Sequence, residues 1–289
     1  MSFADLPPLP PLLLPGAQDY ADRISAASRR VMAATRHLGD IRYADADYWQ
    51  KLDVYLPEGV HDDLPVFCFL HGGAWVNGCK EWMGFMAPPI LSLPAIFVAP
   101  SYRHAPAARF PAQLDDCGDA LAWIHRNITQ YGGAPGKIHL GGHSAGGHLA
   151  ALMTLRPDVP AKRGLPPDVV KACYPVSGVF DLCTGRAHSL EFRKPVDWLL
   201  ADPAQAPAAS PIENLAGNRT PFFVSWGTAD APELAPQARA FVAALRRQPG
   251  RVEALELEGY DHWMTNECGG DPAHRWTQTV RRWLADGPG

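Results

Sequence analysis

The sequence predicts an α/β fold with a mostly parallel, doubly wound sheet, and three observations carry this prediction. Short apolar runs of strand length alternate with segments that repeat apolar residues at helical spacing. Several runs are apolar throughout, as expected for strands that are buried on both faces of a parallel sheet. One run leads through a Gly-rich turn directly into a helix-forming segment, at residues 141–146. With 289 residues, 47% of them hydrophobic, the chain is long enough for one large core, and we expect a single domain over 1–289.

The expected elements follow from these patterns in chain order. A helix is expected over 19–36, behind a proline-rich arm. The expected strands, each a short β-prone run, are 64–70, 137–140, 221–226 and 252–257. The expected helices, each with an apolar stripe or a run of helix formers, are 114–128, 145–155 and 234–245.

Two regions interrupt the alternation of strands and helices. They are the N-terminal segment 1–36 and an insert over 180–215, which has a short helical stretch around 187–200. Ligands in open α/β sheets bind beyond the carboxyl ends of the strands. We therefore expect both regions to form a cap over that edge of the sheet.

The pentapeptide Gly142-His143-Ser144-Ala145-Gly146 indicates the chemistry. A serine in a Gly-x-Ser-x-Gly frame, with a strand before it and a helix after it, is typical of a nucleophile held on a sharp turn. The flanking glycines leave room for the elements that such a turn brings together. Because Gly-rich turns with serine also occur without catalysis, the prediction that Ser144 is a nucleophile depends on partners elsewhere in the chain.

The first partner is a candidate oxyanion hole, in the segment that follows the strand at 64–70. There the sequence reads His71-Gly72-Gly73-Ala74-Trp75. A Gly pair at a strand end frees backbone N–H groups to point at a ligand. We expect N–H groups of the Gly72-Gly73 loop and of Ala145 to hold the oxyanion of a tetrahedral intermediate.

The acid and the base of a catalytic triad are expected next, in that order, each just after a strand. Asp230 follows the strand at 221–226, and His262 follows the strand at 252–257. We expect His262 to take the proton of the serine hydroxyl and Asp230 to orient the imidazole. Glu233 and Asp261 are rival carboxylates. Glu233 lies in the expected first turn of a helix, where a carboxylate is favoured anyway, and Asp261 is adjacent to His262 and would have to point away from it.

Together these motifs resemble the α/β-hydrolase superfamily, in the branch of hormone-sensitive-lipase-like esterases and kynurenine formamidases. The similarity extends from Lys51 to Leu284. Hormone-sensitive-lipase-like members usually have a third glycine in place of Ala74 and an aspartate in place of His143. Kynurenine formamidases resemble this chain at both positions. The resemblance implies an α/β-hydrolase fold and an ester or formamide hydrolase.

The leading functional hypothesis is a serine hydrolase that cleaves small carboxylic esters with a hydrophobic or aromatic group, through an acyl-enzyme. Trp75 and Trp263 adjoin the two catalytic loops, and they are expected to contact the substrate together with His143. Three alternatives remain. They are an arylformamidase acting on amides of the N-formylkynurenine type, an acyltransferase with the same triad, and a non-catalytic binding protein on this fold.

Composition argues against several other classes. The net charge of −4 and the lack of a Lys/Arg-rich run speak against nucleic acid binding. His139, His143 and His148 are close in sequence, but they fall on a strand, a turn and a helix, so no metal site is expected. No phosphate-binding glycine motif occurs, and no cofactor is expected.

The chain is expected to act in the cytoplasm. Its N-terminal apolar stretch is broken by prolines and preceded by Asp5, which fits neither a signal peptide nor a membrane span. The 6 cysteines form no Cys-x-x-Cys pair and are expected to be free thiols. The oligomeric state is left open, with a homodimer as one option.

Overall fold

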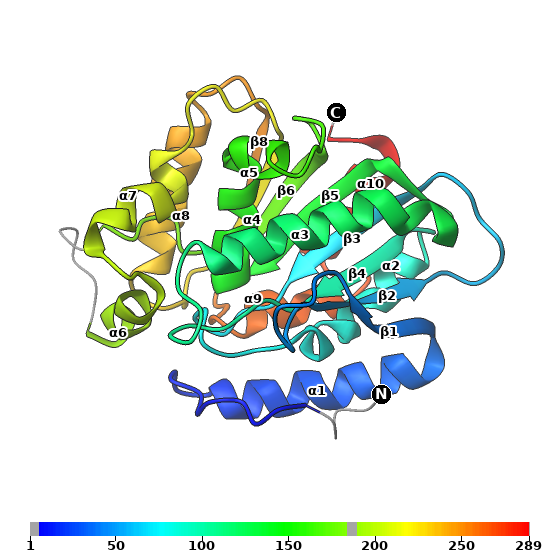
Figure 1. Ribbon diagram of the computed structural model, residues 1–289, viewed down its shortest axis with the longest axis horizontal. Helices are drawn as coiled ribbons and strands as arrows, with labels where there is room; N and C mark the ends of the chain where they lie inside the picture. The colour runs from blue at the N-terminus through cyan, green and yellow to red at the C-terminus, as the bar shows by residue number, and fades with distance from the viewer. Residues whose placement is uncertain (1–5, 184–189, 289) are drawn as a thin grey trace.

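Eight strands form one sheet that runs through the molecule, with helices on both of its faces (Figure 1). The computed structural model describes residues 6–183 and 190–288. The sheet order is β1-β2-β4-β3-β5-β6-β7-β8, and all strand pairs from β4 to β8 are parallel. The strands are β1 (Arg36–Arg42), β2 (Lys51–Leu56), β3 (Leu64–Leu70), β4 (Ile96–Pro100), β5 (Gly133–His143), β6 (Val170–Val176), β7 (Phe222–Gly227) and β8 (Val252–Leu257). This arrangement confirms the predicted α/β class with a mostly parallel, doubly wound sheet.

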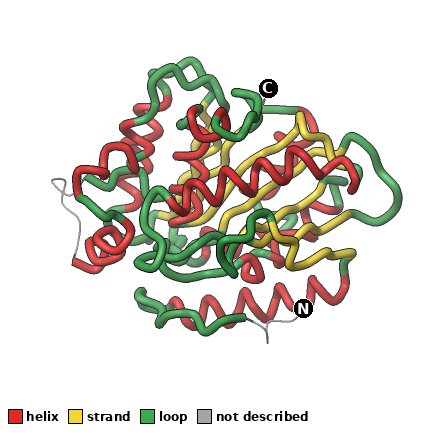
Figure 2. Tube along the Cα trace, viewed as in Figure 1, coloured by secondary structure: helices red, strands yellow, loops and turns green. Residues whose placement is uncertain are grey.

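The helices form two layers around the strands (Figure 2). The α-helices are α1 (Ala17–Ala34), α2 (Ala87–Leu91), α3 (Ala112–Asn127), α4 (Ala145–Leu155), α5 (Asp158–Ala161), α6 (Leu190–Leu199), α7 (Ala206–Ala209), α8 (Leu234–Leu245), α9 (Met264–Glu267) and α10 (Arg275–Asp286). Apolar residues of α3, α4 and α8 pack on one face of the sheet, and those of α1, α2 and α10 belong to the core on the other face. Along β3, Val66 and Cys68 enter the first core while Phe67 and Phe69 enter the second, as the alternation of side chains in a strand requires. None of the described helices has both the length and the apolar character needed to cross a bilayer.

The order of the strands creates a crevice at one point of the sheet. The chain leaves β3 toward β4 on one side and then crosses back to β5 on the other side of β3. A reversal of this kind separates the loops that follow the two central strands and opens a binding crevice at their carboxyl ends. The loop after β3 and the turn after β5 therefore border this crevice from its two sides.

Most predicted elements lie where the sequence pattern indicated, and the differences are at element boundaries. Strands 64–70 and 252–257 and helix 145–155 match β3, β8 and α4. The predicted helix over 19–36 is wrong at its end, because Thr35 is extended at φ −118° and ψ 155°, and the next residue already begins β1. In the insert, α6 covers Leu190–Leu199, and residues 187–189 of the predicted stretch lie outside the described residues.

Candidate active site

Ser144 stands on a strained turn between β5 and α4. Its φ of 54° and ψ of −119° are unusual for a residue with a side chain, and its N–H donates to the carbonyl of Val176 at 2.9 Å. A Cβ atom at Gly142 would lie 2.3 Å from the carbonyl oxygen of Gly146, and one at Gly146 would lie 2.2 Å from the carbonyl oxygen of Leu70. Glycine is thus required on both sides of the serine, and the turn exposes the Ser144 hydroxyl at the edge of the sheet.

The structure brings Ser144, His262 and Asp230 together. His262 Nε2 lies 3.0 Å from Ser144 Oγ, and His262 Nδ1 lies 2.8 Å from Asp230 Oδ1. Because the ionised Asp230 carboxylate can only accept, His262 Nδ1 carries a proton and donates it to Asp230. His262 Nε2 is then unprotonated and accepts the hydrogen bond from the Ser144 hydroxyl. This is the tautomer that a general base next to serine needs.

The environment of Asp230 keeps its carboxylate charged. Burial raises the pKa of this carboxyl, but the charge of His262, the hydrogen bond from His262 and the hydrogen bond from the Ala231 N–H outweigh burial, and the pKa lies below its usual range. The N–H of Ala231 lies 2.7 Å from Asp230 Oδ1. A buried charged carboxylate of this kind stabilises an imidazolium that forms at His262.

The two rival carboxylates have other positions. Glu233 is the N-cap residue of α8, and Asp261 Oδ1 accepts the N–H groups of Trp263 at 2.9 Å and Met264 at 2.8 Å. Asp261 therefore satisfies N–H groups at the start of α9 and points away from the ring of its neighbour His262.

The candidate oxyanion loop lies directly against the serine. A Cβ atom at Gly72 would lie 3.2 Å from Ser144 Cβ, and one at Gly73, where φ is 121°, would lie 2.1 Å from the carbonyl oxygen of Asn77. Only glycine fits this close approach. Ala145 is the first residue of α4, where an N–H has no acceptor within the helix. The Gly72-Gly73 loop and the Ala145 N–H thus border the space in front of Ser144 from two sides.

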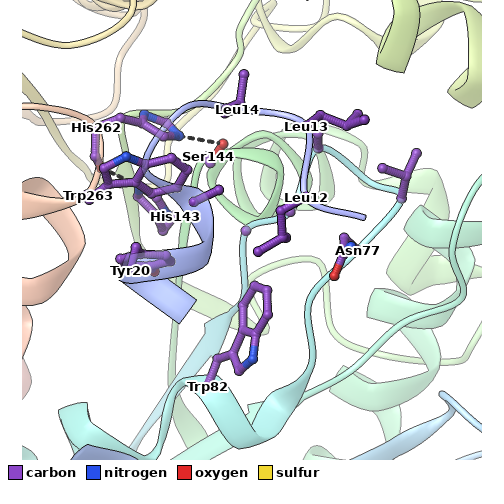
Figure 3. A pocket seen from close by; sticks show the side chains of 15 residues that line it. Leu12, Leu13, Leu14, Tyr20, Asn77, Trp82, His143, Ser144, His262 and Trp263 are labelled. Carbon is purple, nitrogen blue, oxygen red and sulfur yellow. Dashed lines mark hydrogen bonds between the residues drawn. The ribbon is translucent and has the colours of Figure 1, made fainter. Parts of the chain in front are cut away.

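Two cavities open beside Ser144 and share Leu14, Ala74, Ser144 and His262. The first, here called the arm cavity, is shown in Figure 3. It is lined in addition by Leu12, Leu13, Ala17, Tyr20, Gly72, Gly73, Val76, Asn77, Trp82, His143 and Trp263. The second, the Trp75 cavity, is lined in addition by Trp75, Ala145, Val179, Pro195, Ala231 and Leu234. Ser144 therefore lies between two largely apolar spaces.

The three predicted substrate contacts border these cavities in different ways. Trp263 lines the arm cavity and stacks on Tyr20, with ring centroids 4.7 Å apart. Trp75 lines the Trp75 cavity, and its indole N–H donates to His148 Nδ1 at 3.0 Å. His143 lines the arm cavity but is only 1% exposed, and its Nε2 lies 2.9 Å from the carbonyl oxygen of His262.

Sequence reasoning missed the leucines of the arm and Tyr20. Leu12, Leu13 and Leu14 come from the proline-rich segment before α1, and they line the arm cavity together with Ser144; in Figure 3, Leu14 lies above Ser144 and the other two lie to its right. The arm was expected to be part of a cap, but a proline-rich run has no periodicity that says which of its residues face the protein. The placement of these leucines depends on contacts with distant segments.

Two of those contacts hold the arm at its ends. Asn77 Nδ2 donates to the carbonyl of Pro10, and Trp263 Nε1 donates to the carbonyl of Pro15 at 3.2 Å. Proline lacks an N–H group, so the arm is held through its carbonyls, by side chains that also line the arm cavity.

The insert over 180–215 contributes less to the described site. Val179, just before it, and Pro195 of α6 line the Trp75 cavity. Trp198, on the same helix, instead lies under the ammonium of Lys194, 4.8 Å from the ring centroid, and lines neither cavity.

The histidines that are close in sequence do not converge. His139 Nδ1 lies 2.6 Å from the Tyr174 hydroxyl, and His148 Nε2 lies 2.7 Å from the carbonyl oxygen of Ala209. Across the described part of the chain, no three His, Cys, Asp or Glu side chains are grouped so that they would hold a metal ion.

Buried histidines predict how stability depends on pH. Burial lowers the pKa of His71 and His143 to about 3 and of His104, His139 and His148 to about 4, from an ordinary value of 6.5. Between these values the unfolded chain binds more protons than the folded chain, so the free energy of unfolding falls as the pH falls below 6.5. Each histidine contributes about 1.4 kcal/mol per pH unit in that range.

Urea unfolding between pH 7.5 and 5 measures this effect. We expect His139→Gln to reduce the pH slope of the unfolding free energy by about one proton, because glutamine does not titrate. An unchanged slope in this variant would contradict a neutral, buried His139.

The sheet and the Ser144, His262 and Asp230 geometry define the class of the protein, an α/β hydrolase with the candidate nucleophile on the turn after β5. A model of the BD-FAE family matches residues 52–245, more than half of the chain, and the chain belongs to this family.

Individual relatives agree with this class. The chain is 34% identical to esterase LipQ of Mycobacterium tuberculosis over 239 residues, which are 77% of this chain and 55% of LipQ. It is 28% identical to a kynurenine formamidase of Salmo salar over 272 residues, 92% of this chain and 88% of that protein. The chain spans 54 to 59% of the length of three mycobacterial ester hydrolases among the relatives that it matches. The resemblance inferred from the motifs is confirmed.

A solved structure shows the same fold. The hyperthermophilic esterase of the archaeon Pyrobaculum calidifontis superposes with a TM-score of 0.75 at 22% identity, over 92% of each chain. At this identity the likeness establishes the α/β-hydrolase fold.

Proposed function

We propose that the chain is a serine hydrolase that cleaves uncharged carboxylic esters through an acyl-enzyme. The observation that carries the proposal is the position of His262, within hydrogen-bond distance of both Ser144 Oγ, at 3.0 Å, and Asp230 Oδ1, at 2.8 Å. Ester-cleaving relatives support it.

In the first half of the reaction, Ser144 Oγ attacks the ester carbonyl carbon while His262 Nε2 takes the hydroxyl proton. N–H groups of the Gly72-Gly73 loop and of Ala145 stabilise the oxyanion of the tetrahedral intermediate. The intermediate collapses as the bond to the alcohol oxygen breaks, and His262 returns the proton to that oxygen. The products are an alcohol and an acyl group on Ser144.

In the second half, water takes the place of the alcohol. His262 removes a proton from a water molecule whose oxygen attacks the acyl carbonyl carbon, and the bond to Ser144 Oγ then breaks as the serine regains its proton. Asp230 keeps the imidazole in the same tautomer through both halves. The sum is one ester and one water converted to one acid and one alcohol.

The lining of the arm cavity supports an uncharged substrate. Its described residues include no Lys, Arg, Asp or Glu. Two cations on neighbouring segments are bound to carboxylates: Lys80 Nζ lies 2.8 Å from Asp53 and 2.6 Å from Glu81, and Arg103 pairs with Asp116 at 2.8 Å. A charged group brought into the arm cavity would lose its hydration without gaining a partner.

An arylformamidase is the second candidate. The match to a kynurenine formamidase over 92% of this chain favours it, and the same triad can cleave a formamide. The formylated amino acid substrate of such an enzyme carries charges, however, and the arm cavity offers them no ionic partner among its described residues. An acyltransferase and a non-catalytic binding protein have no observation of their own in their favour.

The arm and the insert are proposed to act as the cap that selects the substrate, since residues of the arm line both cavities and Pro195 of the insert lines the Trp75 cavity. We also propose the cytoplasm as the site of action. All 6 cysteines are free thiols, which fits a reducing compartment.

A pair of esters with equal chain length tests the substrate proposal. We expect kcat/KM for 4-nitrophenyl pentanoate to exceed that for mono-4-nitrophenyl glutarate, its carboxylate analogue, by about a hundredfold or more, because the carboxylate would be desolvated without a partner. Initial rates of nitrophenolate release, corrected for spontaneous hydrolysis, measure the ratio. N-formylkynurenine is tested beside them.

A variant with a new cation provides the control. Leu13 lines the arm cavity and is 39% exposed. Leu13→Lys places an ammonium group there, which can pair with the carboxylate of the glutarate ester, and we expect it to reduce the preference for the neutral ester. Val60→Lys introduces the same charge at a residue that is 97% exposed and lies before the start of β3, at the opposite edge of the sheet from the carboxyl ends of the parallel strands, and should leave the preference unchanged. Faster turnover of the glutarate ester and N-formylkynurenine than of the pentanoate would contradict the proposal.

A further inference from the structure

The backbone carbonyl of His262 accepts two hydrogen bonds from buried side chains. His143 Nε2 lies 2.9 Å from this oxygen, and Thr265 Oγ1 lies 2.8 Å from it. His143 is the last residue of β5, whereas Thr265 lies in α9, just after the base. The carbonyl is therefore held from the nucleophile strand on one side and from the helix of its own loop on the other.

The acceptor determines the protonation state of His143. A carbonyl oxygen only accepts, so Nε2 of His143 must carry the proton. Nδ1 is then unprotonated, and it is buried without a hydrogen-bond partner among the described residues. Burial, followed by the charge of His262, lowers the pKa of His143 to about 3, so the ring stays neutral while the enzyme works.

Thr265 extends the support to another strand. Because its hydroxyl proton goes to the His262 carbonyl, Thr265 Oγ1 accepts from Ser177 Oγ, which lies 2.9 Å away at the end of β6. Ser177 and Thr265 are both at most 1% exposed. The loop that carries His262 is thus hydrogen-bonded to residues at the ends of β5 and β6.

The contact between His143 and the His262 carbonyl matters because His143 is adjacent to Ser144 in the chain. Consecutive residues touch the same partner: Ser144 Oγ contacts the ring of His262, and His143 Nε2 contacts its main chain. The rings of His143 and His262 also pack together, with centroids 4.6 Å apart. Two attachments from adjacent residues set the distance between nucleophile and base.

We propose that His143 is a positioning residue for the reaction. It holds the main chain of His262 so that His262 Nε2 stays within hydrogen-bond distance of Ser144 Oγ. The inference rests on the proposed serine hydrolase function. Its physical basis is the steep dependence of proton transfer on geometry, since a misplacement of about 1 Å costs about a hundredfold in rate. Thr265 shares this task through the same carbonyl.

The test is the rate at which a small fluorophosphonate labels Ser144, because labelling needs the base but no bound ester. We expect His143→Leu, which removes the N–H donor, to lower this rate and kcat for 4-nitrophenyl acetate by about 10- to 100-fold, with KM changed less. His143→Gln, whose amide N–H replaces the donor, should stay within about threefold of wild type. Circular dichroism checks that each variant is folded.

His139→Gln is the matched control. His139 lies four residues earlier on β5, is buried like His143, and contacts the Tyr174 hydroxyl rather than the loop of the base. It should lose stability but keep the wild-type labelling rate. Wild-type labelling in His143→Leu, or an equal loss in His143→Gln, would overturn the proposal.

A second pair of variants keeps the proposal testable if His143→Leu does not fold. Thr265→Val removes the other donor at nearly constant volume and should slow labelling, whereas Thr265→Ser keeps the hydroxyl and should restore it. Equal labelling by the two Thr265 variants would then count against the proposal. A wild-type protein that is not labelled at all would instead contradict the proposed hydrolase function.

Discussion

Ser144→Ala is expected to lower kcat/KM for 4-nitrophenyl acetate by about a thousandfold or more without unfolding the protein. The hydroxyl is the attacking atom in the proposed reaction, whereas the turn that presents it is made by the backbone and by Gly142 and Gly146. Ester hydrolysis and labelling by a fluorophosphonate measure the loss, and a thermal melt measures the fold.

Ser225 supplies the matched control. It is a fully buried serine on β7, and its hydroxyl has no hydrogen-bond partner among the described residues. Ser225→Ala removes a hydroxyl from another strand of the same sheet and should keep wild-type activity. If Ser144→Ala retained more than about a tenth of wild-type activity, Ser144 would not be the nucleophile.

His262→Ala and Asp230→Ala are expected to act as one unit. His262→Ala alone should lower kcat/KM by about a thousandfold or more, and adding Asp230→Ala should cost little further, because the carboxylate acts through the imidazole. The geometry behind this expectation is the 2.8 Å contact between His262 Nδ1 and Asp230 Oδ1. The four proteins of the double-mutant cycle are compared at the same pH.

The pH profile adds a second measurement to this cycle. The pKa of Asp230 is lowered, because the charge of His262 and hydrogen bonds outweigh burial, so this carboxylate stays ionised as the pH falls through the working range. Loss of activity on the acid side should therefore not come from protonation of Asp230. Fully multiplicative losses in the double variant would point to another acid, with Glu233 the first to replace, while Asp261→Asn should remain close to wild type.

The order of the candidate catalytic residues was readable from the sequence for a simple reason. Ser144, Asp230 and His262 each follow a short β-prone run, and parallel strands end at the same edge of a sheet. Local patterns therefore predicted that three side chains from distant segments lie at one edge of the sheet. The Gly72-Gly73 loop was identified by the same logic, since it follows β3.

Element boundaries and the less periodic segments were harder to read. The sequence pattern did not delimit β1, β2, β4 or β6, and it extended the first helix into β1. Helix α1 ends at Ala34, and Thr35 is extended. The sequence has no local stop signal there, and we attribute the end of the helix to the pairing of β1 with β2 at the edge of the sheet.

By itself the sequence determined the α/β class, the residue types for acyl transfer and their order along the chain, because short-range patterns of burial and turn formation encode these features. Only the tertiary structure decided that Asp230 Oδ1 contacts His262 Nδ1, and that leucines of the arm line a cavity together with Ser144. It alone brought His143 to the His262 carbonyl, across 119 residues. Contacts of this kind depend on how loops and irregular segments pack after the sheet has formed, and no local repeat in the chain records that packing.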